Sequence, residues 1–407
     1  MKTKSLFLIP ALLAGGWLLP ESLQAGDWKQ FRGPYSSSVA SDAAVEPHLN
    51  LSKVAWKTSL PGRGLGSPIV VGDRVLVTAS SGPRQERLHV MCLRVSDGGK
   101  IWERQFWATG RTMCHEKTSV AAPSPVSDGE RVFALFSSND LFALDLDGNL
   151  LWVRGLGRDY PNASNSLGMS SSPVVSSGAV VVMIENDSES FSAGIDARTG
   201  KNLWKMDRPK LANWTSPTLF KTPQGRELVA LQSGKGLIAV EPASGKIAWS
   251  YKEGSSTIPS STAVDDTLLV PSFGLTALKT SPGGTEAEQL WRSSAMRPGT
   301  ASPVAMGSRV YTLNDAGVLS CAQLSDGKRL WQLRLKGPFS ATPVASGKHL
   351  FCVNEKGVLH VVDTTAAEGA IVSELELADV ILSTPSIAHR SIFVRSDGAL
   401  WRIGDKS

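Results

Sequence analysis

Cysteine is scarce in this sequence, and the motifs that usually tie cysteine or histidine to a metal or a haem are missing. The 407 residues contain four cysteines, Cys92, Cys114, Cys321 and Cys352, and no CxxC, CxxCH or HExxH segment. This excludes the common zinc-finger, c-type haem and zincin motifs. Four cysteines allow one disulfide bridge, for which Cys92 with Cys114 and Cys321 with Cys352 are the candidate pairs, but they are too few for a disulfide framework.

A strong charge of one sign and a long internal hydrophobic run are also missing. The formal net charge is +5, and the basic residues are scattered along the chain. This distribution gives no electrostatic reason to expect binding to nucleic acid or to a membrane surface. No segment after residue 25 is a candidate membrane span. With 42% hydrophobic and 19% charged residues, the chain has a globular composition.

The first 25 residues have the features of a secretory signal peptide. Two lysines precede a leucine- and alanine-rich stretch, and residues 23–25 (LQA) offer a small-residue cleavage site. A membrane anchor is the alternative, but the apolar core over residues 5–20 is interrupted by Pro10 and is shorter than the roughly 20 residues that span a bilayer. We therefore predict a cleaved leader over residues 1–25 and a periplasmic or secreted protein whose mature charge is +4.

One phrase recurs along the rest of the chain: an apolar run, a turn that contains glycine, and a second apolar run that ends in tryptophan. Its copies are MCLRVSDGGKIW (91–102), LFALDLDGNLLW (141–152), AGIDARTGKNLW (193–204), IAVEPASGKIAW (238–249) and SCAQLSDGKRLW (320–331).

A second landmark, Ser-Pro or Thr-Pro followed by an apolar run, precedes each copy of the phrase. It begins at Ser67, Ser124, Ser172, Ser216, Ser302, Thr342 and Thr384, and Ser260 holds the remaining register position with its proline displaced to Pro259. The eight units are spaced by 57, 48, 44, 44, 42, 40 and 42 residues, a period typical of propellers and other repeat arrays.

Within each unit the apolar residues alternate with a period of two, which predicts strands. Short β-branched and aromatic runs such as RVFALFS (131–137), AVVVMIE (179–185), TLLVPS (267–272), RVYTL (309–313) and HLFCV (349–353) follow turn residues. Four strands per unit form a small sheet that cannot bury both faces alone, so neighbouring sheets must stack on it. We predict an all-β fold: an eight-bladed β-propeller of four-stranded antiparallel blades over residues 53–407, preceded by an N-terminal extension over residues 26–52.

The recurring tryptophan is predicted to be structural, because a large flat side chain on the outer strand can wedge between adjacent blades. The set comprises Trp56, Trp102, Trp152, Trp204, Trp249, Trp291 and Trp331. The glycine four positions before the tryptophan suits a hairpin residue with positive φ. The seventh unit has no tryptophan in its phrase VVDTTAAEGAIVSELEL, so we expect its outer seam to be looser.

The two ends of the chain explain how the ring closes. The last unit stops after its third predicted strand, whereas residues 53–59 (KVAWKTS) form a fourth strand without a unit of their own. Pairing these two segments would leave no open sheet edge. We therefore expect the N-terminal strand to complete the eighth blade, and deletion of residues 26–60 to unfold the domain.

These repeats resemble those of a known superfamily, the secreted quinoprotein alcohol dehydrogenase-like propellers built from PQQ-like repeats. Residues 53–404 carry the resemblance, and WKQFRGP (28–34) and LPGRGLGSPIVVGDRV (60–75) look like a bacterial branch of it. The superfamily includes the scaffolding propeller lipoprotein of outer-membrane β-barrel assembly and the PQQ- and Ca²⁺-dependent alcohol dehydrogenases. The resemblance therefore implies a fold without selecting a function.

For an enzyme, the resemblance implies a quinone sandwiched between a tryptophan and a disulfide of two adjacent cysteines, with Ca²⁺ held by acidic and Asn oxygens and an Asp acting as the base. No two cysteines are adjacent here, and the nearest pair, Cys92 and Cys114, is 22 residues apart. The chain also lacks the large loop insertions that build such a pocket. We expect no cofactor, with PQQ and Ca²⁺ as the alternative.

Candidate binding residues gather around two long connections, residues 103–123 and 153–171, since long loops on a rigid propeller commonly carry binding sites. His115, Glu116 and Lys117 place three titratable groups together just before a predicted inner strand. His115 and Lys117 could bind an anion, or His115 and Asp187 could act as a base or a metal pair. The alternative is a solvated loop and a turn cap. The register of the repeats adds further candidates near the same face: Arg63, Asn165, Asn186, Arg208 and Trp214.

Two classes of function stay open. The first is a non-catalytic binding or scaffold module for a protein or carbohydrate partner, with a possible part in envelope assembly and with no catalytic residues. The second is a PQQ- and Ca²⁺-dependent oxidoreductase that acts on alcohols or sugars. The absence of adjacent cysteines and of a haem motif favours the first class. In either case we expect a monomer without a nucleic-acid partner.

Overall fold

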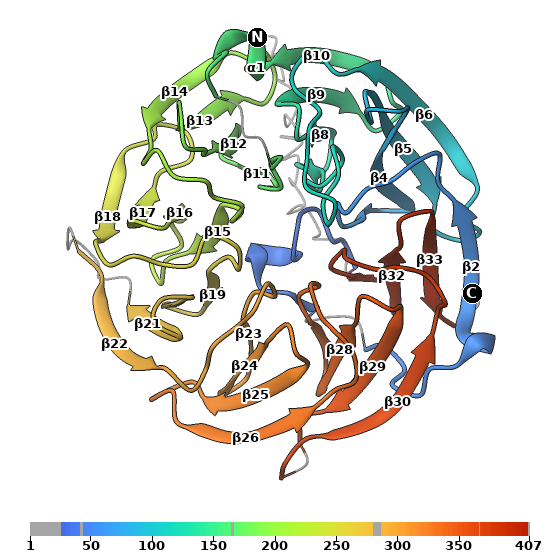
Figure 1. The fold of residues 1–407 in the computed structure, drawn as a ribbon, viewed down its shortest axis with the longest axis vertical. Helices are drawn as coiled ribbons and strands as arrows, with labels where there is room; N and C mark the ends of the chain where they lie inside the picture. Colours follow the sequence, from blue (N-terminus) through green and yellow to red (C-terminus); the bar gives the residue numbers. More distant parts are fainter. Residues whose placement is uncertain (1–25, 41–43, 164–166, 280–285, 366, 406–407) are drawn as a thin grey trace, which may run out of the picture.

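The blades of a propeller surround a central axis in the computed structural model, which describes residues 26–40, 44–163, 167–279, 286–365 and 367–405 (Figure 1). Eight four-stranded antiparallel blades are present among these residues, and in each the four strands are arranged in order outward from the axis; a short parallel strand over Val39–Ala40 is added to the inner edge of one blade. The eight-bladed propeller predicted from the repeat is thus confirmed.

Blades 1 to 4 follow the chain order. Their strands are β3 (Ile69–Val71), β4 (Arg74–Ser81), β5 (Arg87–Arg94), β6 (Lys100–Trp107); β7 (Val126–Ser127), β8 (Arg131–Leu135), β9 (Asp140–Asp145), β10 (Leu150–Gly155); β11 (Val174–Ser176), β12 (Ala179–Ile184), β13 (Phe191–Asp196), β14 (Asn202–Asp207); β15 (Thr218–Lys221), β16 (Glu227–Ser233), β17 (Gly236–Val240), β18 (Ile247–Tyr251). A short helix, α1 (Leu156–Asp159), follows β10.

Blades 5 to 8 continue this order until the last strand. Their strands are β19 (Thr262–Val264), β20 (Thr267–Val270), β21 (Leu275–Lys279), β22 (Glu288–Ser293); β23 (Val304–Met306), β24 (Arg309–Leu313), β25 (Val318–Gln323), β26 (Arg329–Arg334); β27 (Val344–Ser346), β28 (His349–Val353), β29 (Val358–Asp363), β30 (Ala370–Glu376); β31 (Ser386–Ala388), β32 (Ser391–Arg395), β33 (Ala399–Gly404) and β2 (Val54–Ser59).

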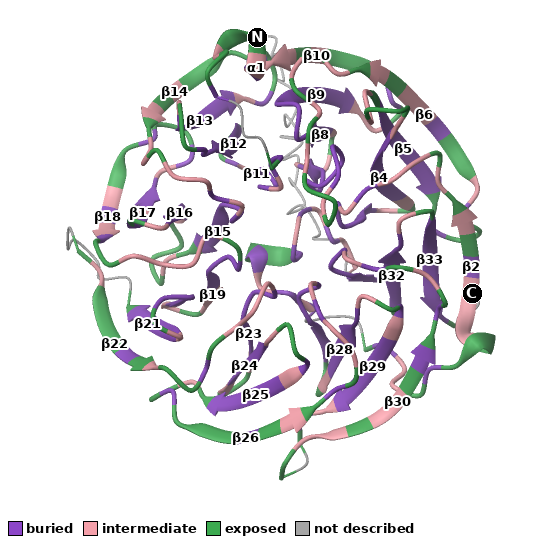
Figure 2. Ribbon diagram, in the orientation of Figure 1, coloured by how far each residue is buried: buried purple, intermediate pink, exposed green. Residues whose placement is uncertain are grey.

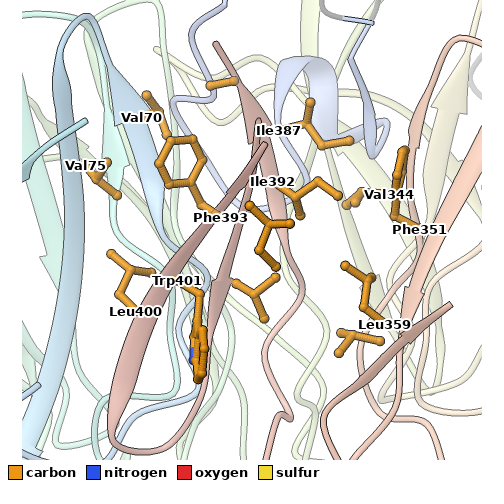
Figure 3. Close-up of a cluster of buried hydrophobic side chains, with 14 of the residues drawn as sticks. Val70, Val75, Val344, Phe351, Leu359, Ile387, Ile392, Phe393, Leu400 and Trp401 are labelled. Atoms are coloured by element: carbon orange, nitrogen blue, oxygen red, sulfur yellow. The ribbon is translucent and has the colours of Figure 1, made fainter. Parts of the chain in front are cut away.

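The ring closes through the N-terminal strand, as the sequence predicted. β2 pairs antiparallel with β33, and the register runs from Val54 opposite Ile403 to Ser59 opposite Ala399. One hydrophobic cluster joins blades 7, 8 and 1 at this closure, and Figure 3 shows Phe393 and Trp401 of blade 8 between Val75 of blade 1 and Phe351 of blade 7. The two chain ends are therefore packed into one core.

Inner and outer strands differ in burial, which accounts for their different sequence patterns. β12 is buried over its whole length, whereas β14 and other outer strands alternate between exposed and more buried residues (Figure 2). The inner strands lie between neighbouring blades and contact apolar groups on both faces. The outer strands face solvent on one side, so the tryptophan of the phrase points inward.

The tryptophans lie at the seams between blades. Trp56 stacks on Gly98 of the next blade, where a Cβ atom would meet the indole ring at 2.6 Å and φ is +68°. The same arrangement repeats for Trp102 on Gly148 and for Trp291 on Gly327. The indole nitrogen of Trp56 also donates a hydrogen bond to the Val95 carbonyl at 2.8 Å. Glycine is thus needed in these hairpins both for its φ and for the closeness of the ring.

Blade 7 departs from this rule, and the N-terminal segment takes the place of the tryptophan. Ser373 occupies the strand position that tryptophan holds in other blades, opposite Val361. Its hydroxyl donates to the Pro47 carbonyl at 2.6 Å and accepts from the Leu49 amide at 3.1 Å. Val45 and Leu49 are buried in the blade 7–8–1 cluster. The expectation of a looser seam is not met, because residues from outside the repeat fill it.

Residues 26–40 run into the ring axis, where Figure 1 shows the blue helical turn η1 (Pro34–Ser36) near the centre. Trp28 exchanges two backbone hydrogen bonds with Val70 of blade 1. The two-residue strand β1 (Val39–Ala40) pairs in parallel with β27 of blade 7. A second short 3₁₀ helix, η2 (Leu51–Lys53), leads into β2. The segment thus links several blades from inside the ring.

Arg32 anchors this segment at the axis. It is fully buried, and its guanidinium donates to the Thr262 hydroxyl at 2.6 Å and to the Ser261 carbonyl at 2.7 Å. Burial lowers the pKa of this guanidinium to about 9.

All four cysteines are free, so neither of the two candidate disulfide bridges is formed. Among the described residues, no helix has the length and apolarity needed to cross a bilayer.

Candidate functional site

A funnel of about 530 Å³ opens at the ring axis on the face that carries the connections between blades. Each of the eight connections contributes to its wall, and Phe31 of the N-terminal segment lines it as well. We define the funnel by Phe31 and by one wall residue from each connection: Leu65, His115, Leu167, Trp214, Ile258, Thr300, Pro338 and Leu382.

A belt of hydroxyl groups surrounds the funnel and explains the Ser/Thr-Pro landmark. At every landmark except Ser67, the hydroxyl accepts a hydrogen bond from the backbone amide of the landmark one blade earlier, at 2.8–3.1 Å. Ser260, whose proline is displaced, takes part like the others. A hydroxyl that accepts one such bond still has its own proton to donate. The belt therefore ties neighbouring blades together and lines the funnel with hydroxyl groups. Its members are Ser67, Ser124, Ser172, Ser216, Ser260, Ser302, Thr342 and Thr384.

The belt is interrupted where the ring closes. The hydroxyl of Ser67 has no hydrogen-bond partner among the described residues. At the same seam, the fully buried guanidinium of Arg395 in blade 8 donates to the Thr78 carbonyl of blade 1. Burial lowers the pKa of Arg395 to about 9. An inter-blade arginine therefore spans the point where the chain of hydroxyl bonds stops.

The long connection between β6 and β7 reaches across the funnel mouth to blade 7. The ammonium group of Lys117 lies 3.1 Å from an Oε atom of Glu355, in the turn between β28 and β29. Glu355 also accepts a hydrogen bond from the Ser340 hydroxyl at 2.7 Å. The Nδ1 atom of His115 accepts from the Lys117 amide at 3.1 Å, so this ring nitrogen is already occupied. The loop thus forms a strap over the opening.

Trp214 forms a fixed aromatic part of the wall. Its indole nitrogen donates to the Gly168 carbonyl at 2.9 Å, and its backbone amide donates to the Thr257 carbonyl at 2.8 Å. Two connections further around the ring, Asp315 accepts from the Thr300 amide at 2.7 Å. These polar groups of the wall therefore already have hydrogen-bond partners within the protein.

Of the predicted binding residues, His115, Lys117 and Trp214 line the funnel together. Glu116 is exposed in the turn beside them. Arg63 pairs instead with Asp397 at 3.2 Å. Asn165 lies outside the described residues. The predicted long connections are shorter than expected, because β6 extends to Trp107 and β10 to Gly155.

The remaining candidates stabilise one region of blade 3. Asn186 is buried and caps its own turn by accepting from the Ser188 amide at 2.7 Å. Asp187 accepts from the Ala212 amide at 3.1 Å. Their partners lie in turns of the chain, and the structure does not bring His115 and Asp187 together as a base or a metal pair.

Arg208 belongs to a buried ion pair. Its guanidinium lies 2.6 Å from Glu185, and the two side chains are 5% and 0% exposed. Burial raises the pKa of the Glu185 carboxyl, and Arg208 offsets part of this increase. Asn213 donates a further hydrogen bond to Glu185 at 2.9 Å. The three side chains therefore satisfy one another, and none of them lines the funnel.

Sequence reasoning missed much of the funnel. Phe31, Asp315 and Glu355 line it, but the first lies outside the repeat and the other two occupy ordinary turns. The belt hydroxyls belong to the Ser/Thr-Pro landmarks, whose spacing predicts the number of blades. The regularity of that landmark was the signal that could have located the funnel.

The funnel residues do not fit a quinone held by Ca²⁺. Its two carboxylates, Asp315 and Glu355, already accept hydrogen bonds from Thr300, Ser340 and Lys117. The described part of the chain contains no group of three or more His, Cys, Asp or Glu side chains placed to hold a metal ion. A hard cation prefers several free oxygen ligands in one place, and this wall does not supply them.

Comparison with known proteins agrees with the repeat. The family described as "Outer membrane protein assembly factor BamB" matches residues 49–210, 162–272 and 275–376. These ranges cover blades 1 to 7 and the whole of β2, the strand that closes the ring.

Two kinds of curated protein are similar in sequence. A polyvinylalcohol dehydrogenase of a Pseudomonas species is 30% identical over 181 residues, which make up 40% of this chain and 25% of that protein. The outer membrane protein assembly factor BamB of Yersinia pestis is 25% identical over 210 residues, or 49% of each chain. This chain therefore spans between a quarter and a half of the length of these relatives.

Solved structures show the same fold at low sequence identity. BamB of Moraxella catarrhalis aligns with a TM-score of 0.64 at 16% identity, over 87% of this chain and 97% of that one. The quinohemoprotein alcohol dehydrogenase of Comamonas testosteroni aligns with a TM-score of 0.71 at 14% identity, over 94% of this chain and 81% of that one. Both an assembly factor and a dehydrogenase thus share this propeller.

Proposed function

The chain belongs to the family of the outer membrane protein assembly factor BamB, and from that premise we propose that it is a binding propeller of the cell envelope whose funnel face holds a partner protein. On this proposal the funnel carries out no redox chemistry. The envelope location rests on the family and on the leader predicted over residues 1–25.

The observation that carries the proposal is the set of apolar side chains exposed on the funnel face. Six large ones lie on its connections, turns and rim: Trp107, Met113, Leu167, Ile258, Phe273 and Val380. Leu167 and Ile258 also line the funnel, so the apolar surface continues from the rim into the hollow. Exposed apolar groups gathered on one face of a soluble fold are typical of a protein-binding site.

The chemistry of the wall supports a polypeptide partner over a charged small molecule. Lys117 and Glu355 pair with each other, and Asp315 is bonded to Thr300. The wall therefore offers no unpaired cluster of charge to an ionic ligand. The apolar groups of the wall suit an apolar side chain of a bound polypeptide. The hydroxyl groups below them can donate hydrogen bonds to the backbone carbonyls of that polypeptide.

Site-specific photo-crosslinking in the native host tests the proposal. A photoreactive amino acid at Ile258 or Phe273 should yield one discrete protein adduct, and the outer-membrane assembly machinery of that host is the first partner to test. Matched positions on the outer strands, Leu203 and Ile247, are similarly exposed and should yield none. An adduct from all four positions, or from none, contradicts the proposal.

Two further measurements separate the alternatives. His115→Ala should leave the thermal midpoint nearly unchanged, because the side chain is exposed, while it weakens the adduct formed from position 258. Purified protein incubated with PQQ and Ca²⁺ should retain neither in stoichiometric amount. Stoichiometric retention with alcohol-dependent dye reduction would instead favour the oxidoreductase, and retention of a sugar would favour a carbohydrate partner.

A further inference from the structure

Three side chains on blade 1 form a hydrogen-bonded relay that is separate from the funnel. The hydroxyl of Ser81 lies 2.7 Å from Nε2 of His89, and Nδ1 of His89 lies 2.8 Å from Oε1 of Glu103. The three residues come from the adjacent strands β4, β5 and β6, and the register places all three on the same face of the sheet. A hydroxyl, an imidazole and a carboxylate in this order are the parts of an activated nucleophile.

The surroundings of Glu103 fix the proton positions in the relay. Its carboxylate accepts from Lys100 at 2.8 Å and from Gln105 at 3.2 Å, in addition to the bond with His89. Burial acts to raise the pKa of Glu103, but the bonds from Lys100 and His89 outweigh it and leave this pKa below its ordinary value. An ionised carboxylate can only accept, so Nδ1 of His89 carries a proton. In the neutral imidazole Nε2 is then free to accept the Ser81 proton.

Blade 7 contains a second histidine–glutamate pair that serves as an internal comparison. Nδ1 of His360 lies 2.8 Å from Glu374, but its Nε2 faces the Lys336 carbonyl at 3.2 Å. A carbonyl oxygen can only accept, so Nε2 of His360 has no lone pair to offer as a base. The pair in blade 7 is therefore a brace between strands. The relay in blade 1 differs because its third partner is a hydroxyl.

The hydroxyl stands next to groups that could hold a substrate. Ser81 is half-buried, and it lies opposite the exposed Arg87 in the β4–β5 ladder. Arg87 in turn lies opposite Trp107, with its guanidinium 5.3 Å from the centre of that ring. A shallow hollow of about 270 Å³ is lined by Arg87, Gln105, Phe106 and Trp107. The site therefore offers a cation and a flat apolar surface beside the hydroxyl.

We propose that Ser81 is the nucleophile of an ester-hydrolysing site, with His89 as its general base and Glu103 as a positioning residue. The substrate class is a carboxylic ester that carries an anionic group, for Arg87, and a flat apolar group, for Trp107. The proposed site shares Trp107 with the apolar surface that we assign to the partner, but Ser81, His89 and Glu103 do not line the funnel.

The reaction balances with water as the co-reactant. Ser81 Oγ bonds to the ester carbonyl carbon while His89 takes its proton, and the alcohol leaves with that proton as the C–O bond breaks. Water then attacks the acyl-Ser81 ester, giving up one proton to His89. The carboxylic acid departs, and the proton returns to Ser81 Oγ. One ester and one water yield one acid and one alcohol.

Labelling of the full chain with an alkyl fluorophosphonate tests the proposal, because this probe reacts with activated serines. Mass spectrometry should find one adduct per chain, mapped to Ser81, and none in Ser81→Ala. His89→Gln should lower the labelling rate by about 100-fold or more. His360→Gln, the matched control in blade 7, should label at the wild-type rate. An unlabelled Ser81 in the folded wild-type chain, or labelling that is unaffected by His89→Gln, overturns the proposal and makes the relay a brace.

Substrate preference and pH provide independent readouts. The wild-type chain should hydrolyse p-nitrophenyl succinate with a higher kcat/KM than p-nitrophenyl acetate, and Arg87→Met should remove this difference by raising KM for the succinate. If His89→Gln does not fold, the pH profile of wild-type labelling replaces it. A rate that rises with pH through a single ionisation and then levels off supports a protein side chain as the base. A rate proportional to hydroxide from pH 5 to 9 contradicts it.

Discussion

Two seams of the ring solve the same packing problem with different parts of the chain. Between blades 5 and 6, Trp291 stacks on Gly327 and its indole nitrogen donates to the Leu324 carbonyl at 2.8 Å. Between blades 7 and 8, Ser373 stands at the tryptophan position, and Leu49 from the N-terminal segment lies against it. The first seam is built from the repeat alone, whereas the second needs residues that precede the repeat.

The reason for the difference is the way the ring closes. Six tryptophans pack on the hairpin glycine between the third and fourth strands of the next blade: Trp56, Trp102, Trp152, Trp204, Trp291 and Trp331. In blade 8 the fourth strand is β2, which comes from the other end of the chain, so no hairpin joins it to β33. A tryptophan in blade 7 would have no hairpin glycine to contact. The segment that leads into β2 passes this position instead and fills it.

The largest expected effect comes from removing the N-terminal residues altogether. Deletion of residues 26–60 removes β2, leaves β33 with an open edge, and takes Trp28, Arg32 and Leu49 out of the core. We expect loss of the cooperative thermal transition, measured by calorimetry and far-ultraviolet circular dichroism. The chain that lacks only residues 1–25 is the control and should unfold cooperatively. A folded, soluble, monomeric deletion variant would refute the closure argument.

Truncating the wedge of the regular seam should be the next largest effect. Trp291 is 8% exposed, and Trp291→Ala removes both its packing on Gly327 and its hydrogen bond. We expect a loss of about 3–5 kcal/mol in the free energy of unfolding, as for other buried tryptophans. Urea denaturation measures this change. A loss of less than about 1 kcal/mol in the free energy of unfolding would show that Trp291 does not stabilise the seam between the blades.

The irregular seam should respond to a residue outside the repeat. Leu49 is 4% exposed and packs in the cluster shared by blades 7, 8 and 1. We expect Leu49→Ala to cost about 2–3 kcal/mol. Leu51 is two residues away and 69% exposed, so Leu51→Ala should change stability by less than about 0.5 kcal/mol. Equal losses of stability in the two variants would mean that the N-terminal segment lies on the surface of the propeller and is not part of its core.

Most of the fold could be predicted because the same sequence pattern recurs in successive units of the chain. The Ser/Thr-Pro spacing fixed eight blades, and the strand without a unit at residues 53–59 predicted the closure that β2 and β33 make. The path of residues 26–52 could not be predicted, because it is not repeated. Arg32 finds its partners Ser261 and Thr262 more than 200 positions along the chain, and no local pattern specifies such contacts.

The site was less predictable than the fold, because a residue lines the funnel through its position on the ring and not through its amino-acid type. His115, Lys117 and Trp214 do meet in the funnel. Arg208 looked similar in sequence, yet it is held by Glu185 inside blade 3. Titratable residues in long loops therefore led to the face that carries the funnel, whereas only the structure separates the funnel wall from structural ion pairs.

The smallest expected effect tests whether Ser373 itself holds the irregular seam. Its hydroxyl donates to the Pro47 carbonyl and accepts from the Leu49 amide, but that amide also bonds to the Pro47 carbonyl at 3.2 Å. Ser373→Ala therefore leaves the Leu49 amide partly satisfied, and we expect a loss of about 1 kcal/mol. Ser325→Ala, at an exposed turn of blade 6, is the control and should show none. Combined with Trp291→Ala, the loss should be additive, since the two seams share no partner. Strong coupling between the two substitutions would mean that the two seams unfold as one unit. The seams would then be built from different residues without being independent in stability.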